Sequence, residues 1–326
     1  MKKTEELLYV IVFVQQKVIL KSNKGANMNL VITDLNKSFK QNHVLRDINL
    51  NVNSGQIFGY LGRNGAGKTT SLRILMDVFE GDSGTITMDG KEFKPGDYRI
   101  GYLPEERGMY SKFKVKDQLI YFAELRGATK KEAEKSMKKW CKEFGIEKYL
   151  DQKLETLSKG NQQKVQITQA FINEPDILIL DEPFSGLDPV NSKIFQDALL
   201  SYIREDRIII FSSHQMSYVE SFCDDIAIIN EGKIVLDGNL NDIRRKMGEG
   251  KLRLRFSDMT NLDFLSEYRY TVENEDVILR LNANETKKSF LKNLLNEDIE
   301  LTMFTNYRPS LQEIFIEKAG DQIEAV

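Results

Sequence analysis

The chain has 326 residues, of which 41% are apolar, so it can bury the core of one large α/β domain and a small companion. Its 46 lysine and arginine residues nearly match its 49 aspartate and glutamate residues, and the net charge of −3 gives no overall basic excess that would favour nucleic-acid binding. Its two cysteines, Cys141 and Cys223, lie far apart, which fits free thiols in a reducing cytoplasm rather than a disulfide framework.

Residues 1–27 differ from the sequence that follows them. Their longest apolar run, residues 7–14, is too short to cross a bilayer, and no small-x-small cleavage site follows it. Codons available for residues 24–26 contain a purine-rich ribosome-binding sequence of bacterial type, and strand-like sequence begins directly after Met28. We therefore predict that translation starts at Met28 and that residues 1–27 are a start-site misassignment. Peptides from residues 2–27 in the native protein would contradict this prediction.

Residues 28–249 alternate between strand-like and helical runs, which predicts an α/β domain with a mixed sheet and an antiparallel β flank. Residues 115–157 have helical periodicity throughout and predict a helical insert, in which Cys141 lies on an apolar stripe. The continuous apolar runs favour parallel strands that are buried on both faces. Strands are expected at residues 29–33, 48–52, 56–61, 85–88, 177–180, 207–212 and, as a pair, within 226–236.

Residues 250–326 have a different pattern, which predicts a small α+β module after a boundary at residues 247–250. Strict alternation at residues 251–256 and 277–281 indicates strands. Helical runs follow, and Ser310 and Glu313 have the spacing of a capping box at the start of the last one. No residue of this module indicates chemistry.

The most informative motif is GRNGAGKT at residues 62–69, which fits the phosphate-binding pattern G-x-x-x-x-G-K-[ST]. A strand-like run precedes it and a helical run follows, so backbone N–H groups and the helix N-terminus can meet an anion. The motif predicts a nucleoside triphosphate with Mg²⁺, in which Lys68 reaches the β- and γ-phosphates and the Thr69 hydroxyl binds the metal. The nucleotide-contacting residues expected here are Gly62, Arg63, Asn64, Gly65, Ala66, Gly67, Lys68, Thr69 and Thr70.

Polar residues end two of the predicted strands. Asp181 and Glu182 follow the run ILIL, at the edge of a sheet where α/β proteins bind ligands. Asp181 is expected to orient Mg²⁺ directly or through water, and Glu182 to accept a proton from, or align, the water that attacks the γ-phosphate. His214 ends the run RIIIFSSH, where it can donate a hydrogen bond to a γ-phosphate or serve a structural role.

A second anion site is predicted at Ser158, which precedes a helical run that begins in LSKGNQQK. A serine, a glycine and free N–H groups at a helix start can bind an anion, although ordinary helix capping explains the same residues. One nucleotide has little use for two such sites in one chain.

The order Phe39, GRNGAGKT, LSKGNQQK, ILILDEP, SGLD, SSH resembles the ATP-binding cassette of ABC transporters over residues 28 to about 240. The resemblance implies a P-loop NTPase fold, ATP as the nucleotide and hydrolysis to ADP and phosphate. It also implies a head-to-tail dimer in which Ser158 and Gly160 of one copy close over the P-loop of the other. Phe39 would stack on adenine, and Asp188 would lie in the loop that passes between subunits.

The resemblance extends to partners. The helical insert is similar to the subdomain that docks on membrane-spanning permease subunits, which implies a transporter subunit at the cytoplasmic face of the membrane. YLPEERG at residues 102–108 and PSLQEIF at residues 309–315 are similar to ATPase subunits of bacterial sodium and drug exporters, so export is expected. The sequence does not identify the transported substrate.

Three residues depart from the family pattern. Glu105 stands where most cassettes have a glutamine that touches Mg²⁺ and links the site to the transport partner, and we expect it to bridge metal and helical insert. Lys159 replaces a glycine of the signature motif, where it either adds charge beside the partner's γ-phosphate or points to solvent. Asn161 replaces the glutamine of that motif.

Three alternatives are weighed against the transporter subunit. A soluble ABC ATPase acting on ribosomes or nucleic acid usually carries two cassettes in one chain, and this chain has one. Chromosome-organising relatives interrupt the cassette with long coiled coils, and no heptad run of that length is present. The run NKSF at residues 36–39 is near a guanine-reading motif but lacks its acid and precedes the P-loop, which argues against a GTPase.

Overall fold

The computed structural model describes residues 27–105, 108–259, 262–296 and 299–320. The predicted start-site misassignment of residues 1–27 therefore lies, apart from Asn27, outside the described residues. The chain divides into two compact units: unit 1 runs to Gly238 and resumes at Lys318, and unit 2 is Asn239–Glu317. The division precedes the predicted boundary at residues 249–250 because helix α8 (Leu240–Met247) belongs to unit 2.

The antiparallel flank of unit 1 is a four-stranded sheet in the order β2-β1-β4-β5. Its strands are longer than the sequence pattern predicted, since β1 and β2 continue past their apolar cores and pair as far as Phe39 and Asn42. Shifts of register interrupt this pairing after Ile32. The strands of this sheet are β1 (Asn29–Phe39), β2 (Asn42–Asn53), β4 (Ser83–Met88) and β5 (Lys91–Glu92).

The central sheet of unit 1 has six strands in the order β10-β9-β3-β8-β7-β6. β3 pairs in parallel with β9 and β8, and β7 pairs in parallel with β8 and β6, which confirms the predicted parallel sheet. Every residue of β3, β7 and β8 is buried. The strands are β3 (Ile57–Gly62), β6 (Ile100–Leu103), β7 (Ile177–Asp181), β8 (Ile208–Ser212), β9 (Asp225–Asn230) and β10 (Lys233–Asn239).

The register of this sheet brings the carboxyl ends of its strands to one edge. Ser212, the last residue of β8, is aligned with Tyr60 in β3 and with Asp181 in β7. Among the strands of this sheet, β3 is followed along the chain by the outermost strand β6, then by β7 and β8, which return toward β3, and then by β9 on the other side of β3. Ligands of open α/β sheets bind at such an edge.

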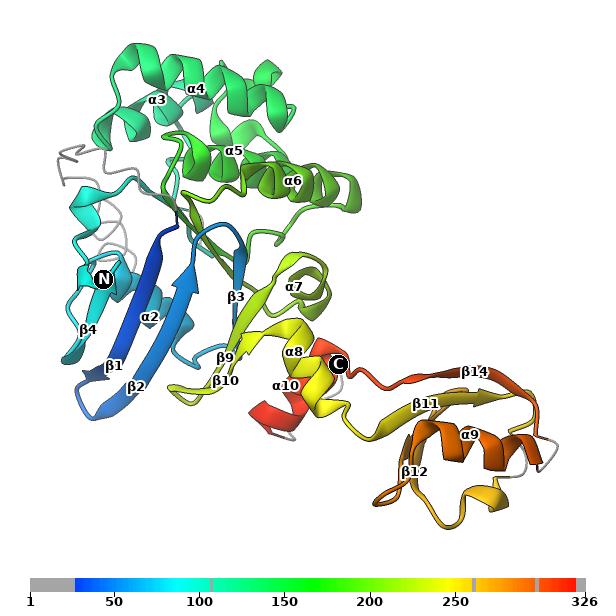
Figure 1. Ribbon diagram of the computed structural model, residues 1–326. Helices are drawn as coiled ribbons and strands as arrows, with labels where there is room; N and C mark the ends of the chain where they lie inside the picture. The colour runs from blue at the N-terminus through cyan, green and yellow to red at the C-terminus, as the bar shows by residue number, and fades with distance from the viewer. Residues whose placement is uncertain (1–26, 106–107, 260–261, 297–298, 321–326) are drawn as a thin grey trace. The chain divides into compact units, whose positions relative to one another are not determined.

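The helical insert of unit 1 gathers with the two helices that follow it, as Figure 1 shows for α3 to α6. The indole ring of Trp140 lies 4.6 Å from the ring of Phe171 and 5.6 Å from that of Tyr202, so an aromatic cluster joins α4 to α5 and α6. Cys141 is fully buried beside this cluster, as predicted. The helices are α2 (Lys68–Leu75), α3 (Val115–Leu125), α4 (Lys130–Glu143), α5 (Lys159–Phe171), α6 (Pro189–Tyr202) and α7 (Met216–Phe222).

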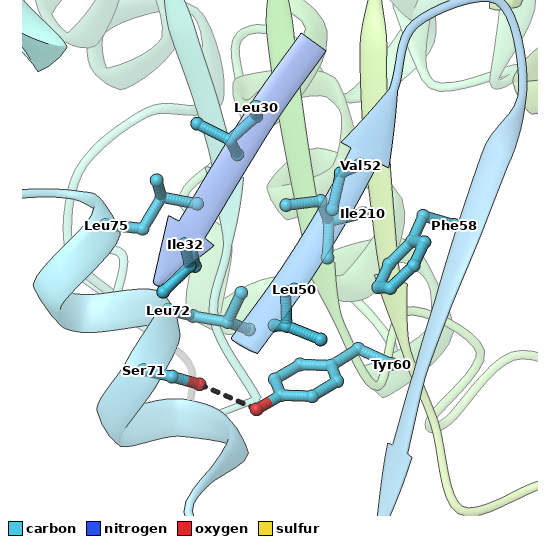
Figure 2. A pocket seen from close by; sticks show the side chains of 10 residues that line it. All are labelled: Leu30, Ile32, Leu50, Val52, Phe58, Tyr60, Ser71, Leu72, Leu75 and Ile210. Carbon is cyan, nitrogen blue, oxygen red and sulfur yellow. Dashed lines mark hydrogen bonds between the residues drawn. The ribbon is translucent and has the colours of Figure 1, made fainter. Parts of the chain in front are cut away.

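An apolar core fills the space between the flank sheet, the central sheet and α2. Figure 2 shows ten of its side chains around a cavity of about 10 Å³, whereas one water molecule needs roughly 10–15 Å³. The cavity is therefore a packing void and not a ligand site. Its one polar pair joins the Tyr60 hydroxyl to Ser71 Oγ at 3.0 Å, and Ser71 Oγ lies 2.8 Å from the carbonyl of Lys68. This pair of hydroxyl groups thus links β3 to the first turn of α2 on the side of the apolar core.

Unit 2 is an antiparallel sheet in the order β12-β13-β11-β14 with helix α9 packed on one face (Figure 1). Leu252, Leu254 and Phe256 alternate with half-buried polar residues along β11 and pack against Phe290 of α9. Ser310 and Glu313 form the predicted capping box at α10. The elements are β11 (Lys251–Phe256), β12 (Arg269–Glu273), β13 (Asp276–Arg280), α9 (Lys287–Asn296), β14 (Leu301–Asn306) and α10 (Leu311–Ala319).

Candidate active site

The predicted phosphate-binding loop joins β3 to α2. Gly67, directly before the helix, has φ of 116°, and a Cβ on it would lie 2.7 Å from Leu45 Cδ2, so no other residue fits. A Cβ on Gly65 would meet nothing within 4 Å, which leaves the outer side of the loop open. The first N–H groups of α2 have no side-chain cap, so they remain available to an anion.

Lys68 is bound to the loop that it follows. Its ammonium group donates to the carbonyls of Gly62 at 2.6 Å and Arg63 at 3.2 Å, and its side chain is buried. Burial lowers the pKa of Lys68, while the nearby carboxylates of Asp181, Glu182 and Glu105 act in the opposite direction. The positive charge of Lys68 therefore lies near three carboxylates and beside the loop that is predicted to bind phosphate.

Asp181 lies at the end of β7 and links the P-loop helix to β8. Its carboxylate accepts hydrogen bonds from Thr69 Oγ1 at 3.2 Å and from Ser212 Oγ at 2.6 Å, and it is 2% exposed. A carboxylate this deep needs such partners, because an unpaired buried charge is costly. The structure therefore places Thr69 and Asp181 side by side, as a shared metal site requires.

Glu182 is held by its backbone conformation and by hydrogen bonds from two neighbouring residues. Its φ of 50° places a side chain other than Asn or Asp in the left-handed region, a strain that clusters at functional sites. Its carboxylate accepts from the backbone N–H of His214 at 2.7 Å and from Ser213 Oγ at 3.1 Å. His214 Nδ1 lies 2.7 Å from the same Glu182 oxygen as its N–H, and the imidazole is 60% exposed. One edge of the His214 ring therefore faces Glu182 while the ring remains accessible.

Glu105 follows β6 and belongs to the same electrostatic group. Burial raises its pKa, and the charges of Asp181 and Glu182 raise it further, whereas Lys68 and His214 lower it. The negative charges of Asp181 and Glu182 thus act on Glu105, and a cation at this edge of the sheet would offset their repulsion. β6 pairs in parallel with β7 up to Leu103 and Leu180. Glu105, two residues after the end of β6, therefore lies near the same carboxyl edge of the sheet as Asp181.

The second predicted anion site lies at the start of α5. Ser158 is the N-cap, and its hydroxyl accepts from the N–H of Asn161 at 3.4 Å. Within the chain this helix start is joined to the segment after Glu182: Gln163 Nε2 donates to the carbonyl of Pro183, and a Cβ on Gly160 would lie 3.4 Å from the carbonyl of Gly186. The contacts of Ser158 and Gly160 are thus with their own neighbourhood and not with the P-loop of the same chain.

Phe39 and Asp188 complete the predicted residues. Phe39 ends β1, is 45% exposed and lies edge-on to Phe79 at 5.4 Å. Asp188 caps α6 by accepting from the N–H of Asn191 at 2.9 Å, and this hydrogen bond lowers its pKa. Both side chains are thus exposed at the ends of elements.

Sequence reasoning missed the groups that hold these acids. Ser212 and Ser213 bind Asp181 and Glu182, and their signal was their place in the run SSH directly before His214. Gln163 is a further example, since its partner Pro183 lies on another element. Strand periodicity marks such residues as part of a strand end and says nothing of their partners.

The donor set fits Mg²⁺. A hydroxyl and a carboxylate are hard oxygen ligands, and the 3.2 Å between Thr69 Oγ1 and Asp181 Oδ2 is near the separation of about 3 Å between adjacent oxygens of an octahedral magnesium shell. The described residues contain no cluster of three or more His, Cys, Asp or Glu that could hold a metal. Magnesium at nucleotides needs none, since it takes one or two protein ligands beside phosphates and water.

Within the described part of the chain, no helix is long and apolar enough to span a membrane.

Two family models match the chain. One, described as ABC transporter, matches residues 45–185, and one described as ATP-binding protein DrrA1-3-like, C-terminal domain, matches residues 238–319. The uncharacterized ABC transporter ATP-binding protein YhaQ of Bacillus subtilis is 40% identical over 89% of this chain and 98% of its own length. The bacitracin transport ATP-binding protein BcrA of Bacillus licheniformis is 30% identical over 88% of this chain and 96% of its own.

Solved structures agree in fold. An ATP binding subunit of an ABC transporter matches with a TM-score of 0.62 and 30% identity over 67% of this chain and 93% of that chain. A dimeric bacterial ABC transporter cassette matches with a TM-score of 0.59 over 64% of this chain and 98% of that chain, and at 21% identity it supports the fold alone. These matches give no support to the ribosomal alternative. The chain therefore belongs to the family of ABC transporter ATP-binding proteins, the ATP-hydrolysing subunits of transporters.

Proposed function

We propose that Glu182 and His214 catalyse ATP hydrolysis at the carboxyl edge of the central sheet, and that this site drives transport by a separate membrane-spanning permease. The observation that carries the proposal is the strained, buried Glu182, whose carboxylate is held by His214 and Ser213 beside the P-loop edge. Two hydrogen bonds and a disfavoured φ angle fix the Glu182 carboxylate at the place where we expect the γ-phosphate of bound ATP to lie.

The nucleotide is bound by the loop and by the end of β1. Backbone N–H groups from Gly62 to Thr70 would surround the phosphates, and Lys68 would exchange two carbonyl partners for phosphate oxygens. The exchange is favourable because the Lys68 ammonium group is attracted more strongly to an anionic phosphate oxygen than to a neutral carbonyl oxygen. Phe39 has the exposure that stacking on adenine needs.

Mg²⁺ would be held by the Thr69 hydroxyl and the Asp181 carboxylate, and when bound it would neutralise part of the phosphate charge. Ser212 holds the other Asp181 oxygen, so that carboxylate is already oriented. Glu105 would approach the same cation, whose charge relieves its repulsion with Asp181 and Glu182. We expect Glu105 also to carry the link to the helical insert.

In the hydrolytic step, a water oxygen attacks the γ-phosphorus while the bond to the β-phosphate oxygen breaks and ADP leaves. Glu182 accepts the proton of that water. His214 keeps Glu182 in place through Nδ1, and the rest of its exposed ring faces outward, where it can bind a γ-phosphate oxygen. The ring nitrogen that carries the proton decides whether Nε2 donates to that oxygen.

A second copy of the chain would complete the site. In each chain Ser158 and Gly160 lie beside the segment after Glu182, so a helix N-terminus that closes over the partner's P-loop would move with its own catalytic segment. Asp188 would lie at this junction. Subunits of this family act with permeases and dimerise; a homodimer at the cytoplasmic membrane face is our expectation. The likeness to a bacitracin transport ATP-binding protein supports transport, and we propose export as its direction.

The test is the Glu182→Gln variant of the full chain, assayed for phosphate release and for ATP binding. We expect hydrolysis to fall by about 10²-fold or more while ATP affinity stays close to that of the wild type, because the carboxamide keeps the volume but cannot accept a proton. Glu155→Gln, an exposed change outside the site, serves as the matched control. Hydrolysis by Glu182→Gln within about twofold of the control would refute the role of Glu182.

A further inference from the structure

The C-terminal end of α10 contacts the phosphate-binding loop. Residues from Lys318 onward belong to unit 1 although α10 begins in unit 2. Arg63 Nη2 donates to the carbonyl of Gly320 at 2.6 Å, a contact between residues 257 positions apart. The last carbonyls of a helix lack partners within it and carry its negative end, so a guanidinium group is a favourable cap.

Arg63 also binds Lys68, the lysine that is predicted to contact the phosphates. The backbone carbonyl of Arg63 accepts from Lys68 Nζ at 3.2 Å, while its side chain binds Gly320. Arg63 therefore connects the end of α10 directly to the Lys68 ammonium group, which is expected to bind phosphate. In a P-loop the phosphates are met by backbone N–H groups, so the Arg63 side chain is free for this second task.

A second path joins the same two places. Asn230 Nδ2, at the end of β9, donates to the carbonyl of Ala319 at 3.3 Å. Gly232, in the turn after β9, donates its N–H to the carbonyl of Ala66 at 3.0 Å. A Cβ on Gly232 would lie 2.3 Å from the carbonyl of Val44, so the turn is tightly fitted. Both the first half and the second half of the loop are thus tied to residues 319–320.

We propose that residues 319–320 are a positioning element of the nucleotide site, acting through Arg63 and through the Asn230 turn. They hold the loop in the conformation that receives the triphosphate, so that less ordering is needed on binding. We call these contacts the α10 clamp.

Two variants break the Arg63 contact from opposite sides. Arg63→Ala removes the donor. Gly320→Val displaces the acceptor, because Gly320 has φ of 86°, which a β-branched residue adopts poorly, while the space around its Cβ position is open. Arg63→Lys keeps a donor at the same place. Arg204→Ala is the matched control, since Arg204 is an exposed arginine of unit 1 that pairs with Asp206.

The experiment is a titration of each full-length variant with a fluorescent ATP analogue and Mg²⁺, with KM and kcat measured in parallel. We expect Arg63→Ala and Gly320→Val each to weaken binding by about three- to tenfold, and kcat to change by less than about twofold. The double variant should be no weaker than the worse single one, because both remove one contact. Arg63→Lys should recover most of the affinity, and Asn230→Ala should cost less than Arg63→Ala.

An affinity of Arg63→Ala equal to that of Arg204→Ala, or losses that multiply in the double variant, would overturn the clamp. The inference rests on the P-loop being the nucleotide site, so Lys68→Ala is titrated in the same series. If Lys68→Ala binds as tightly as the wild type, the assignment of the site has failed. If Lys68→Ala is weak and Arg63→Ala is normal, only the clamp has failed.

Discussion

The two units place their polar side chains in opposite ways. Every buried side chain with a charge, an amide or an aliphatic hydroxyl among the described residues lies in unit 1, and Lys68, Asp181 and Glu182 are among them. In unit 2 the buried side chains are aliphatic or aromatic, with the Tyr307 hydroxyl bound to Glu313, and the charged pair of Arg255 with Asp276 is only partly buried. Buried charge costs stability unless it is paired, so a unit that retains it does so for chemistry. The buried side chains of unit 2, in contrast, form a hydrophobic core.

The largest effect expected from this contrast is on the stability of unit 2. Leu279→Ala removes a fully buried side chain from its core and should destabilise the unit by about 2–5 kcal/mol. Separate thermal transitions of the two units, followed by hydrogen exchange, would measure it. Retention of the exchange protection of unit 1 is expected. Equal loss of protection in both units would contradict the division.

The next effect is on nucleotide affinity in unit 1. Lys68→Ala should weaken ATP binding by roughly 10- to 150-fold, because it removes hydrogen bonds from a charged donor. The folded state should be less affected, since burial already disfavours the charged lysine and lowers its pKa. Calorimetric titration measures the loss. Lys193→Ala, an exposed lysine paired with Asp197, is the control and should bind as the wild type does.

A smaller effect is expected behind the loop. Tyr60→Phe removes the buried hydroxyl that binds Ser71 and should cost about 1 kcal/mol. Burial raises the pKa of Tyr60, so the hydroxyl stays neutral and the cost should not depend on pH in the neutral range. Chemical denaturation of unit 1 would measure it. A variant as stable as the wild type would show that the pair does not fasten α2 to β3.

The smallest effect depends on pH. The pKa of Glu105 is raised by burial and by Asp181 and Glu182, so its charged form is less favourable in the folded protein than in the unfolded chain. This destabilisation is fully present above the folded pKa and disappears as the pH falls below the usual value of about 4.3. Glu105→Gln should therefore raise the melting temperature of metal-free protein at neutral pH, with a gain that vanishes toward acid. A gain independent of pH, or a loss, would contradict it.

Much of this contrast could be predicted from the sequence. The P-loop, the strands that end in Asp181 and Ser212, and the alternation of residues 251–256 are local patterns, and local geometry produces them. Strand β6 was missed because four residues with a glycine give no clear period, and β12 because all five of its residues are exposed. The contacts of Ser213 and Arg63 were beyond reach because their partners are distant in sequence.

The central claim is that this P-loop is half of an active site that a second copy completes. It is tested most directly by mixing two full-length variants, Lys68→Ala with a disabled P-loop and Ser158→Phe with a disabled helix start, and by measuring ATP hydrolysis. Each variant alone should be nearly inactive. The mixture should regain roughly a quarter of the wild-type rate, because half of randomly paired dimers contain one intact site out of two. A mixture no more active than the average of the separate variants would contradict the account.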